Sequence, residues 1–201
     1  MKNEELNLLS FKKIPPGHQA AFGKGTVRVE VLPAGFRMFK LTAGGALQSA
    51  KWGVTPWWSP VKPFKEDHEG ALGRFIQANM NGVDMSTMVR FMSAVCVDWN
   101  DLDNYVEVRL KQQTKAFWGT FAPQKLYDKP QTDLQKAVQR AQDVTAGADL
   151  PPDLGTLEAW QLYVPNLRNE DIIRDSFLPA HNMGTLAMHF GVGANHGKRR
   201  G

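Results

Sequence analysis

The sequence predicts an α+β fold whose central sheet is mainly antiparallel, with helices packed around it. Strict alternation of apolar and polar residues over 26–32, 105–110 and 157–164 indicates strands that each bury one face. Segments with helical spacing separate these strands irregularly, whereas a parallel sheet alternates strand and helix evenly. There is no internal repeat and no long linker, so residues 1–201 are expected to form one domain.

The individual elements are predicted by two periodicities, alternation of apolar and polar residues for strands and helical spacing of apolar residues for helices. The expected strands cover residues 26–32, 36–42, 105–110, 115–121 and 157–164. The expected helices cover residues 69–80, run from residue 84 or 86 to 92, and begin at the capping box Thr132-x-x-Gln135, where polar residues indicate a surface helix.

Two N-terminal segments lack such a period. The first 20 residues are mixed, and Pro15-Pro16-Gly17 is expected to break any regular element there. After Gly44-Gly45 a long segment with three tryptophans and several prolines is expected to be irregular.

Two further segments are short and ambiguous. Residues 94–99 are predicted to form a buried strand or the end of the preceding helix, which places Cys96 in the core. Asn169 is expected to cap a short helix that carries Ile172, Ile173 and Phe177.

Composition and charge disfavour several classes of protein. Apolar residues make up 42% of the chain, yet their runs are far shorter than a membrane span of about 20 residues. A single cysteine excludes an internal disulfide framework and fits a cytoplasmic protein. The N-terminus has no Sec-type apolar region, so export is expected only through a secretion system that needs none.

The formal net charge of +4 is concentrated at the C-terminus. Lys198, Arg199 and Arg200 end a glycine-rich stretch, so residues 191–201 are expected to form a flexible basic tail. Nucleic-acid binding is therefore expected only weakly, through these three side chains.

Common catalytic motifs are absent. The chain has no phosphate-binding GxxxxGK[ST], no GxGxxG after a strand, no HExxH, no CxxC and no GxSxG. The five histidines are scattered and are expected to be solvated or hydrogen-bonded, so no metal site is predicted.

Four short blocks carry a more specific pattern. Residues 32–42 contain a Pro-x-Gly turn that leads into a strand with basic residues, and residues 52–60 are rich in tryptophan. Residues 115–124 and 158–165 supply a later Gly-x-x-Ala-x-Gln stretch and a strand with Glu and Gln. In this order, over about residues 25–165, the blocks resemble ADP-ribosyltransferases and related NAD-glycohydrolase toxins.

The resemblance implies that NAD is the substrate and assigns residues to its parts. Arg37 or Lys40 would hold the dinucleotide, and alternation places these two side chains on opposite faces of the strand. Trp57 and Trp58, together with Ser59, would wall off the nicotinamide. A protein target or an immunity protein is the expected partner.

The same resemblance places the catalytic group at Gln161 or Glu158. Alternation puts these residues on opposite faces, and the face of Glu158 is the more apolar. That face should meet the core, which leaves Gln161 exposed toward a cleft. An amide supplies no negative charge, so a Gln site favours hydrolysis of NAD over rapid transfer of ADP-ribose.

The alternative is a protein without enzymatic activity. An immunity, adaptor or structural partner could use exposed tryptophans as interface anchors. A cleft that holds Trp58, Ser59, Gln161 and a cation favours the enzyme, whereas a flat tryptophan surface favours the binding module.

Overall fold

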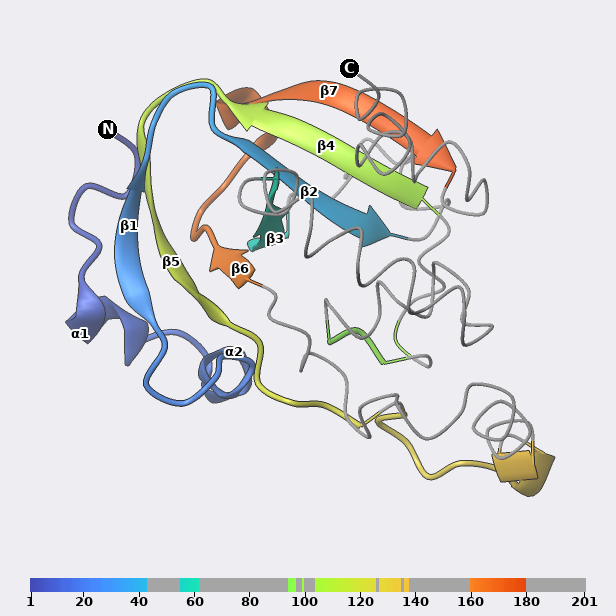
Figure 1. Ribbon diagram of the computed structural model, residues 1–201. Helices are drawn as coiled ribbons and strands as arrows, with labels where there is room; N and C mark the ends of the chain where they lie inside the picture. Colours follow the sequence, from blue (N-terminus) through green and yellow to red (C-terminus); the bar gives the residue numbers. More distant parts are fainter. Residues whose placement is uncertain are drawn as a thin grey trace, which may run out of the picture.

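In the computed structural model, the described part of the chain contains a curved antiparallel sheet of seven strands (Figure 1). The structure describes residues 1–42, 55–61, 94–96, 99, 104–125, 127–134, 136–137 and 160–179. The strands are β1 (Arg28–Leu32), β2 (Arg37–Thr42), β3 (Trp57–Pro60), β4 (Asn104–Leu110), β5 (Thr114–Thr120), β6 (Trp160–Tyr163) and β7 (Ile172–Pro179). Their order is β1-β5-β6-β3-β2-β4-β7 and every pairing is antiparallel, which confirms the predicted sheet.

Three segments that lie far apart in the sequence are neighbours at the middle of the sheet. β3 pairs with β6 on one side, where Trp58 lies opposite Leu162. On its other side β3 pairs with β2 at only two positions, Met38 with Pro60 and Phe39 with Ser59. The ladder between β2 and β3 therefore ends after Phe39.

The sheet buries side chains on both faces. Successive side chains of a strand point to opposite faces, so Leu162 and Tyr163 belong to different clusters. Leu162 packs in a mainly aliphatic core with Met38 and Trp58. Tyr163 packs in an aromatic core with Phe117 and other rings.

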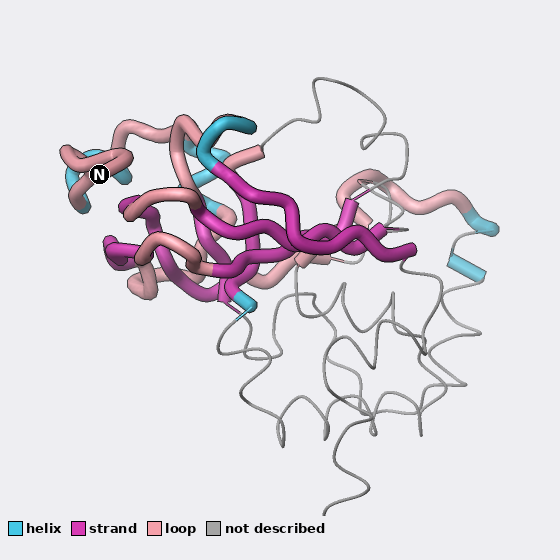
Figure 2. The backbone as a smooth tube through the Cα atoms, turned by 90° about the horizontal axis from the view of Figure 1, so that it is seen from above, coloured by secondary structure: helices cyan, strands magenta, loops and turns pink. Residues whose placement is uncertain are grey.

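The N-terminal segment forms two short helices beside the β1–β5 end of the sheet (Figures 1 and 2). Asn7 caps α1 (Leu8–Phe11) by accepting hydrogen bonds from two backbone amides. α2 (Pro16–Ala20) has Pro16 in its first turn, where a missing N–H costs nothing. The expectation that Pro15-Pro16-Gly17 excludes regular structure is therefore wrong.

Two other expectations change. The predicted helix after Asn169 is only a 3₁₀ turn, η1 (Asn169–Asp171), and Ile172 begins β7. Without β7, one edge of β4 would be unpaired. The long antiparallel ladder that β7 forms with this edge outweighs the weak helical preference of the β7 residues. Within the segment expected to be irregular, residues 57–60 form β3.

Several expected features lie partly or wholly outside the described residues. The helices over 69–80 and 84–92 and the tail over 191–201 are among them. The start of the helix after Thr132 is present, because the Lys136 amide donates to the Thr132 carbonyl at 3.0 Å. Ala94 lies in a turn rather than in the expected strand or helix, and Cys96 is buried as expected.

An ion pair fastens the N-terminal segment to the loop before β7. Lys2 Nζ lies 2.8 Å from Asp171 Oδ2, and both side chains are largely buried. Burial opposes ionisation of Asp171, but hydrogen bonds from Lys2, the Arg168 amide and Gln112 outweigh it and lower the pKa of Asp171 below 3.8. A depressed carboxyl pKa stabilises the fold above the unfolded-state value and loses that effect as pH falls through the folded-state value.

We expect Lys2→Met to lower the free energy of unfolding by about 1–3 kcal/mol at pH 7. The difference from the wild type should shrink as pH falls below 3.8, because Asp171 takes up a proton first in the unfolded state and, at lower pH, in the folded state. Urea unfolding at pH 7 and at pH 3 measures both values. An equal difference at the two pH values would show that the Asp171 charge is not involved.

Candidate functional site

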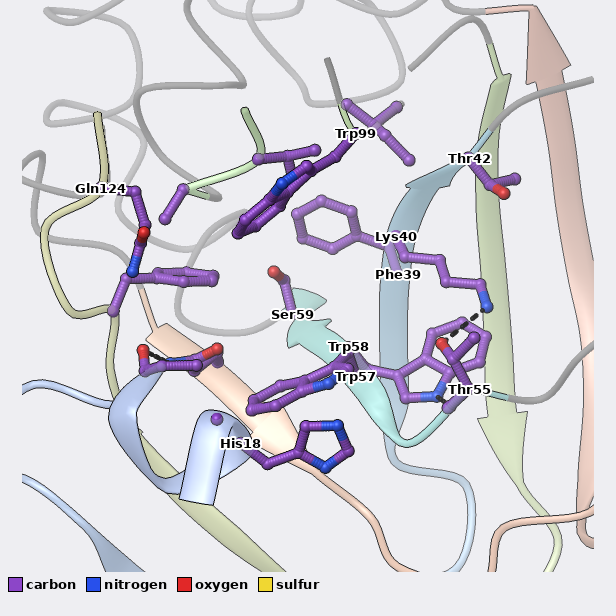
Figure 3. Close-up of a pocket in the computed structure, with 17 residues that line it drawn as sticks. His18, Phe39, Lys40, Thr42, Thr55, Trp57, Trp58, Ser59, Trp99 and Gln124 are labelled. Carbon is purple, nitrogen blue, oxygen red and sulfur yellow. Dashed lines mark hydrogen bonds between the residues drawn. The ribbon is translucent and has the colours of Figure 1, made fainter. Parts of the chain in front are cut away.

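A cavity of about 440 Å³ lies beside the point where the β2–β3 ladder ends (Figure 3). Its volume is in the range of small-molecule sites. Its walls are largely apolar and include aromatic side chains from separate parts of the chain, namely Phe39, Trp57, Trp58, Trp99 and Phe121. Figure 3 shows the Ser59 side chain directed into the space between Trp57, Phe39 and Trp99.

Lys40 gives the cavity a positive charge. Its ammonium lies 4.5 Å from the centre of the Trp58 ring and donates to Thr55 Oγ1 at 3.2 Å. Burial lowers the pKa of Lys40 to about 8. The described residues that line the cavity include no Asp or Glu, so this part of the wall favours an anionic ligand.

Arg37 occupies a different environment. Its guanidinium forms an ion pair with Glu107, whose side chain is fully buried. Tyr105 donates to Glu107 Oε2 at 2.8 Å, and burial and the Glu107 charge raise the pKa of Tyr105. Arg37 is not among the residues that line the cavity, so Lys40 is the candidate cation of the site.

Gln161 lines the cavity but is only 3% exposed, so the expectation of an exposed side chain is wrong. β6 has β3 on one side and β5 on the other, and both faces of the sheet are covered. Alternation therefore cannot distinguish an inner from an outer face at this strand. Glu158 lies outside the described residues.

The hydrogen bonds of Gln161 fix the orientation of its amide. Nε2 donates to the Ala21 carbonyl at 2.7 Å and to the Thr120 carbonyl at 3.2 Å. Two carbonyl acceptors require the nitrogen at this end, so Oε1 is the opposite end. Oε1 accepts no hydrogen bond from the described part of the chain, and Gln161 can therefore offer an acceptor to a ligand.

Three tryptophans of the described segments, Trp57, Trp58 and Trp99, line the cavity rather than form a flat surface. Trp58 is 2% exposed, and its indole N–H donates to the Thr55 carbonyl at 2.9 Å. Trp57 is half-buried, whereas Trp99 is 52% exposed. Outside the cavity, the Arg28 guanidinium lies 5.5 Å from the rings of both Trp118 and Trp160.

The sequence pattern assigned no individual role to several polar residues of the cavity, among them His18 and Gln124. His18 comes from α2, and its Nδ1 lies 3.1 Å from the Tyr163 hydroxyl. A Pro-Pro-Gly start is compatible with a helix N-terminus, and this signal could have placed His18 on a helix. Gln124, at the end of the 115–124 block, also lines the cavity.

No group of three or more potential metal ligands occurs within the described residues. None of the helices in that part of the chain is long and apolar enough to cross a membrane.

Comparison with known proteins gives two distant structural likenesses. No family model and no curated protein matches the sequence significantly. A chain from the structure of Tne2 in complex with Tni2 is 12% identical, with a TM-score of 0.44 over 79% of this chain and 98% of that one. A chain from the complex of Rhs1-CT with its cognate immunity protein RhsI1 is 11% identical, with a TM-score of 0.39 over 76% of this chain and 80% of that one. Likenesses at this level do not indicate an activity.

Proposed function

We propose that this chain is an NAD-consuming toxin or effector domain that hydrolyses NAD at the cavity beside β2 and β3. One observation carries the proposal: Lys40, Trp58, Ser59 and Gln161 line a single cavity. These residues come from three adjacent strands, β2, β3 and β6, to which the sequence resemblance assigned the contacts with NAD. A cleft of this composition favours an enzyme over a flat binding surface.

The cavity suits the parts of a dinucleotide. Lys40 offers a point charge for the pyrophosphate. Trp57 and Phe39 offer ring faces against which a base or the nicotinamide can stack while water is excluded. Ser59 offers a hydroxyl that can donate to or accept from the ligand.

The proposed reaction breaks the bond between the ribose carbon and the nicotinamide nitrogen. Both bonding electrons leave with the nicotinamide, and the ribose passes through an oxocarbenium-like state. A water molecule then bonds to that carbon and releases a proton, which gives ADP-ribose and free nicotinamide. The fixed Oε1 of Gln161 accepts from a ribose hydroxyl and turns the negative end of a dipole toward the developing positive charge.

Hydrolysis is proposed rather than transfer to a protein. Water is small enough to reach a ribose that lies between the side chains of the cavity. The described lining of the cavity has no carboxylate that could act as a base for a larger acceptor. Consumption of NAD would damage the cell that makes the protein, so the expected partner is an immunity protein that blocks the cavity.

The Lys40 charge gives a pH test of the ligand class. The ammonium is protonated below a pKa of about 8 and attracts phosphate, whereas the amine above it is neutral. We therefore expect the dissociation constant for ADP-ribose to rise about tenfold between pH 7 and pH 9.

Isothermal titration calorimetry of the wild type measures this change. Lys40→Arg, which stays charged, should remove the pH dependence and retain binding. Lys40→Met should remove the dependence and weaken binding at pH 7. A wild type that binds ADP-ribose equally at both pH values would exclude Lys40 as the phosphate contact.

The activity itself is tested by incubating the purified protein with NAD and following nicotinamide by liquid chromatography. Release of nicotinamide above the spontaneous rate supports the proposal. A folded protein that releases none would contradict it and favour the binding module.

A further inference from the structure

α2 holds His18 in a fixed place at the cavity. The Gln161 amide donates to the Ala21 carbonyl just after the helix, and the Gln19 amide donates to the Ile14 carbonyl at 2.8 Å just before it. The next residue, Phe22, packs in the aromatic core. The helix is short, but both of its ends are fastened, so the His18 side chain is positioned rather than free.

The hydrogen bond to Tyr163 determines what His18 offers to a ligand. Burial raises the pKa of Tyr163, so its phenol is protonated at neutral pH. A phenol is the better donor of this pair and an imidazole nitrogen the better acceptor, so the Tyr163 hydroxyl donates to Nδ1 over 3.1 Å. The neutral ring then carries its proton on Nε2, and the imidazolium form carries one there too. Among the described residues Nε2 has no partner, so His18 presents a donor in either form.

The rings around His18 indicate which part of the ligand it meets. His18 packs edge-on against Trp57, with ring centres 5.6 Å apart, and its ring also lies 5.4 Å from that of Tyr163. Figure 3 shows His18 beside Trp57, while Lys40 extends to Thr55 and Trp58. An anionic phosphate belongs with Lys40, whereas an aromatic ring with a polar substituent belongs with Trp57 and His18.

We infer that His18 binds the nicotinamide half of the substrate, by donating from Nε2 to the carboxamide oxygen of a ring stacked on Trp57. This inference rests on the proposed function and deepens it, because it divides the cavity into two subsites. Lys40 holds the ADP-ribose half and His18 holds the leaving group. The donor draws electron density toward the carboxamide and keeps the ring in one orientation as the bond to ribose breaks.

The division is tested by titrating the two halves of NAD separately into wild type and variants, with calorimetry as the readout. His18→Ala should weaken nicotinamide binding about tenfold and leave the affinity for ADP-ribose within twofold of the wild type. His18→Gln restores a side-chain N–H and should recover most of the nicotinamide affinity. Lys40→Met is the matched control and should show the opposite pattern.

Tyr163→Phe gives a second route that leaves the aromatic core filled. It removes the hydroxyl that fixes the imidazole, so nicotinamide binding should weaken by a smaller factor than in His18→Ala. Nicotinamide affinity within twofold of the wild type in both His18→Ala and Tyr163→Phe would overturn the inference, while turnover of NAD by the wild type would leave the proposed function standing. A wild type that binds neither half and releases no nicotinamide would overturn both.

Discussion

Replacing Gln161 by alanine should lower kcat/KM for NAD hydrolysis by about 30- to 1,000-fold, which corresponds to about 2–4 kcal/mol of transition-state stabilisation. The fixed Oε1 is the group that meets the ribose as positive charge develops on it, so its effect is largest in the transition state. The loss should therefore fall mainly on kcat, with a smaller change in KM. Initial rates of nicotinamide release over a range of NAD concentrations measure both parameters.

The same substitution should also lower the free energy of unfolding by about 1–3 kcal/mol, because the Ala21 and Thr120 carbonyls each lose a side-chain donor and keep only a backbone one. Asn3 offers a matched control. Its amide likewise donates to two backbone carbonyls, those of Lys115 and Pro165, and it does not line the cavity. Its φ of 55° is accessible to glycine, so Asn3→Gly removes the amide without adding strain.

Asn3→Gly should thus lower the free energy of unfolding by about as much as Gln161→Ala does, and it should leave the kcat of the folded protein unchanged. A Gln161→Ala variant with wild-type kcat would show that Gln161 only fastens α2 to β5 and β6. Equal losses of kcat in the two variants would lead to the same conclusion.

Replacing Arg37 by methionine should lower the free energy of unfolding by about 3 kcal/mol, since it removes the cation paired with the buried Glu107. The side chain of Arg37 is 47% exposed, so water reaches part of the ion pair, and the loss of unfolding free energy should not exceed about 3 kcal/mol. Arg37→Lys keeps the charge without the guanidinium geometry and should cost less. Urea unfolding measures all three proteins.

A double variant separates the ion pair from other roles of Arg37. Arg37→Met combined with Glu107→Gln removes the buried charge with its partner and should recover much of the stability. The kcat of folded Arg37→Met should equal that of the wild type. A selective loss of NAD affinity, without loss of stability, would move the phosphate contact from Lys40 to Arg37.

The antiparallel sheet was predictable because its strands carry strong alternation. Residues 26–32 and 105–110 show this pattern, and the structure places β1 and β4 there. β7 was not predictable from local pattern, because its extended form depends on pairing with β4 rather than on its own residues. β3 was missed for the same reason, since its four residues contain a proline and gain their order from β2 and β6.

The site was predictable in part. Alternation correctly places Arg37 and Lys40 on opposite faces of the strand. Only the structure shows that Arg37 pairs with the buried Glu107, whereas Lys40 lines the cavity. The burial of Gln161 depends on the carbonyls of Ala21 and Thr120, which no pattern near residue 161 reveals. His18 reaches the cavity through the packing of α2, a contact between segments 145 positions apart in the sequence.

The proposed hydrolysis of NAD can be followed directly with the wild-type protein in water enriched in oxygen-18. We expect free nicotinamide and an equal amount of ADP-ribose that carries one heavy oxygen on the anomeric carbon, both detected by mass spectrometry. An intact NAD pool after incubation with folded protein would rule out this activity, and nicotinamide release with ADP-ribose recovered on protein rather than in solution would rule out hydrolysis.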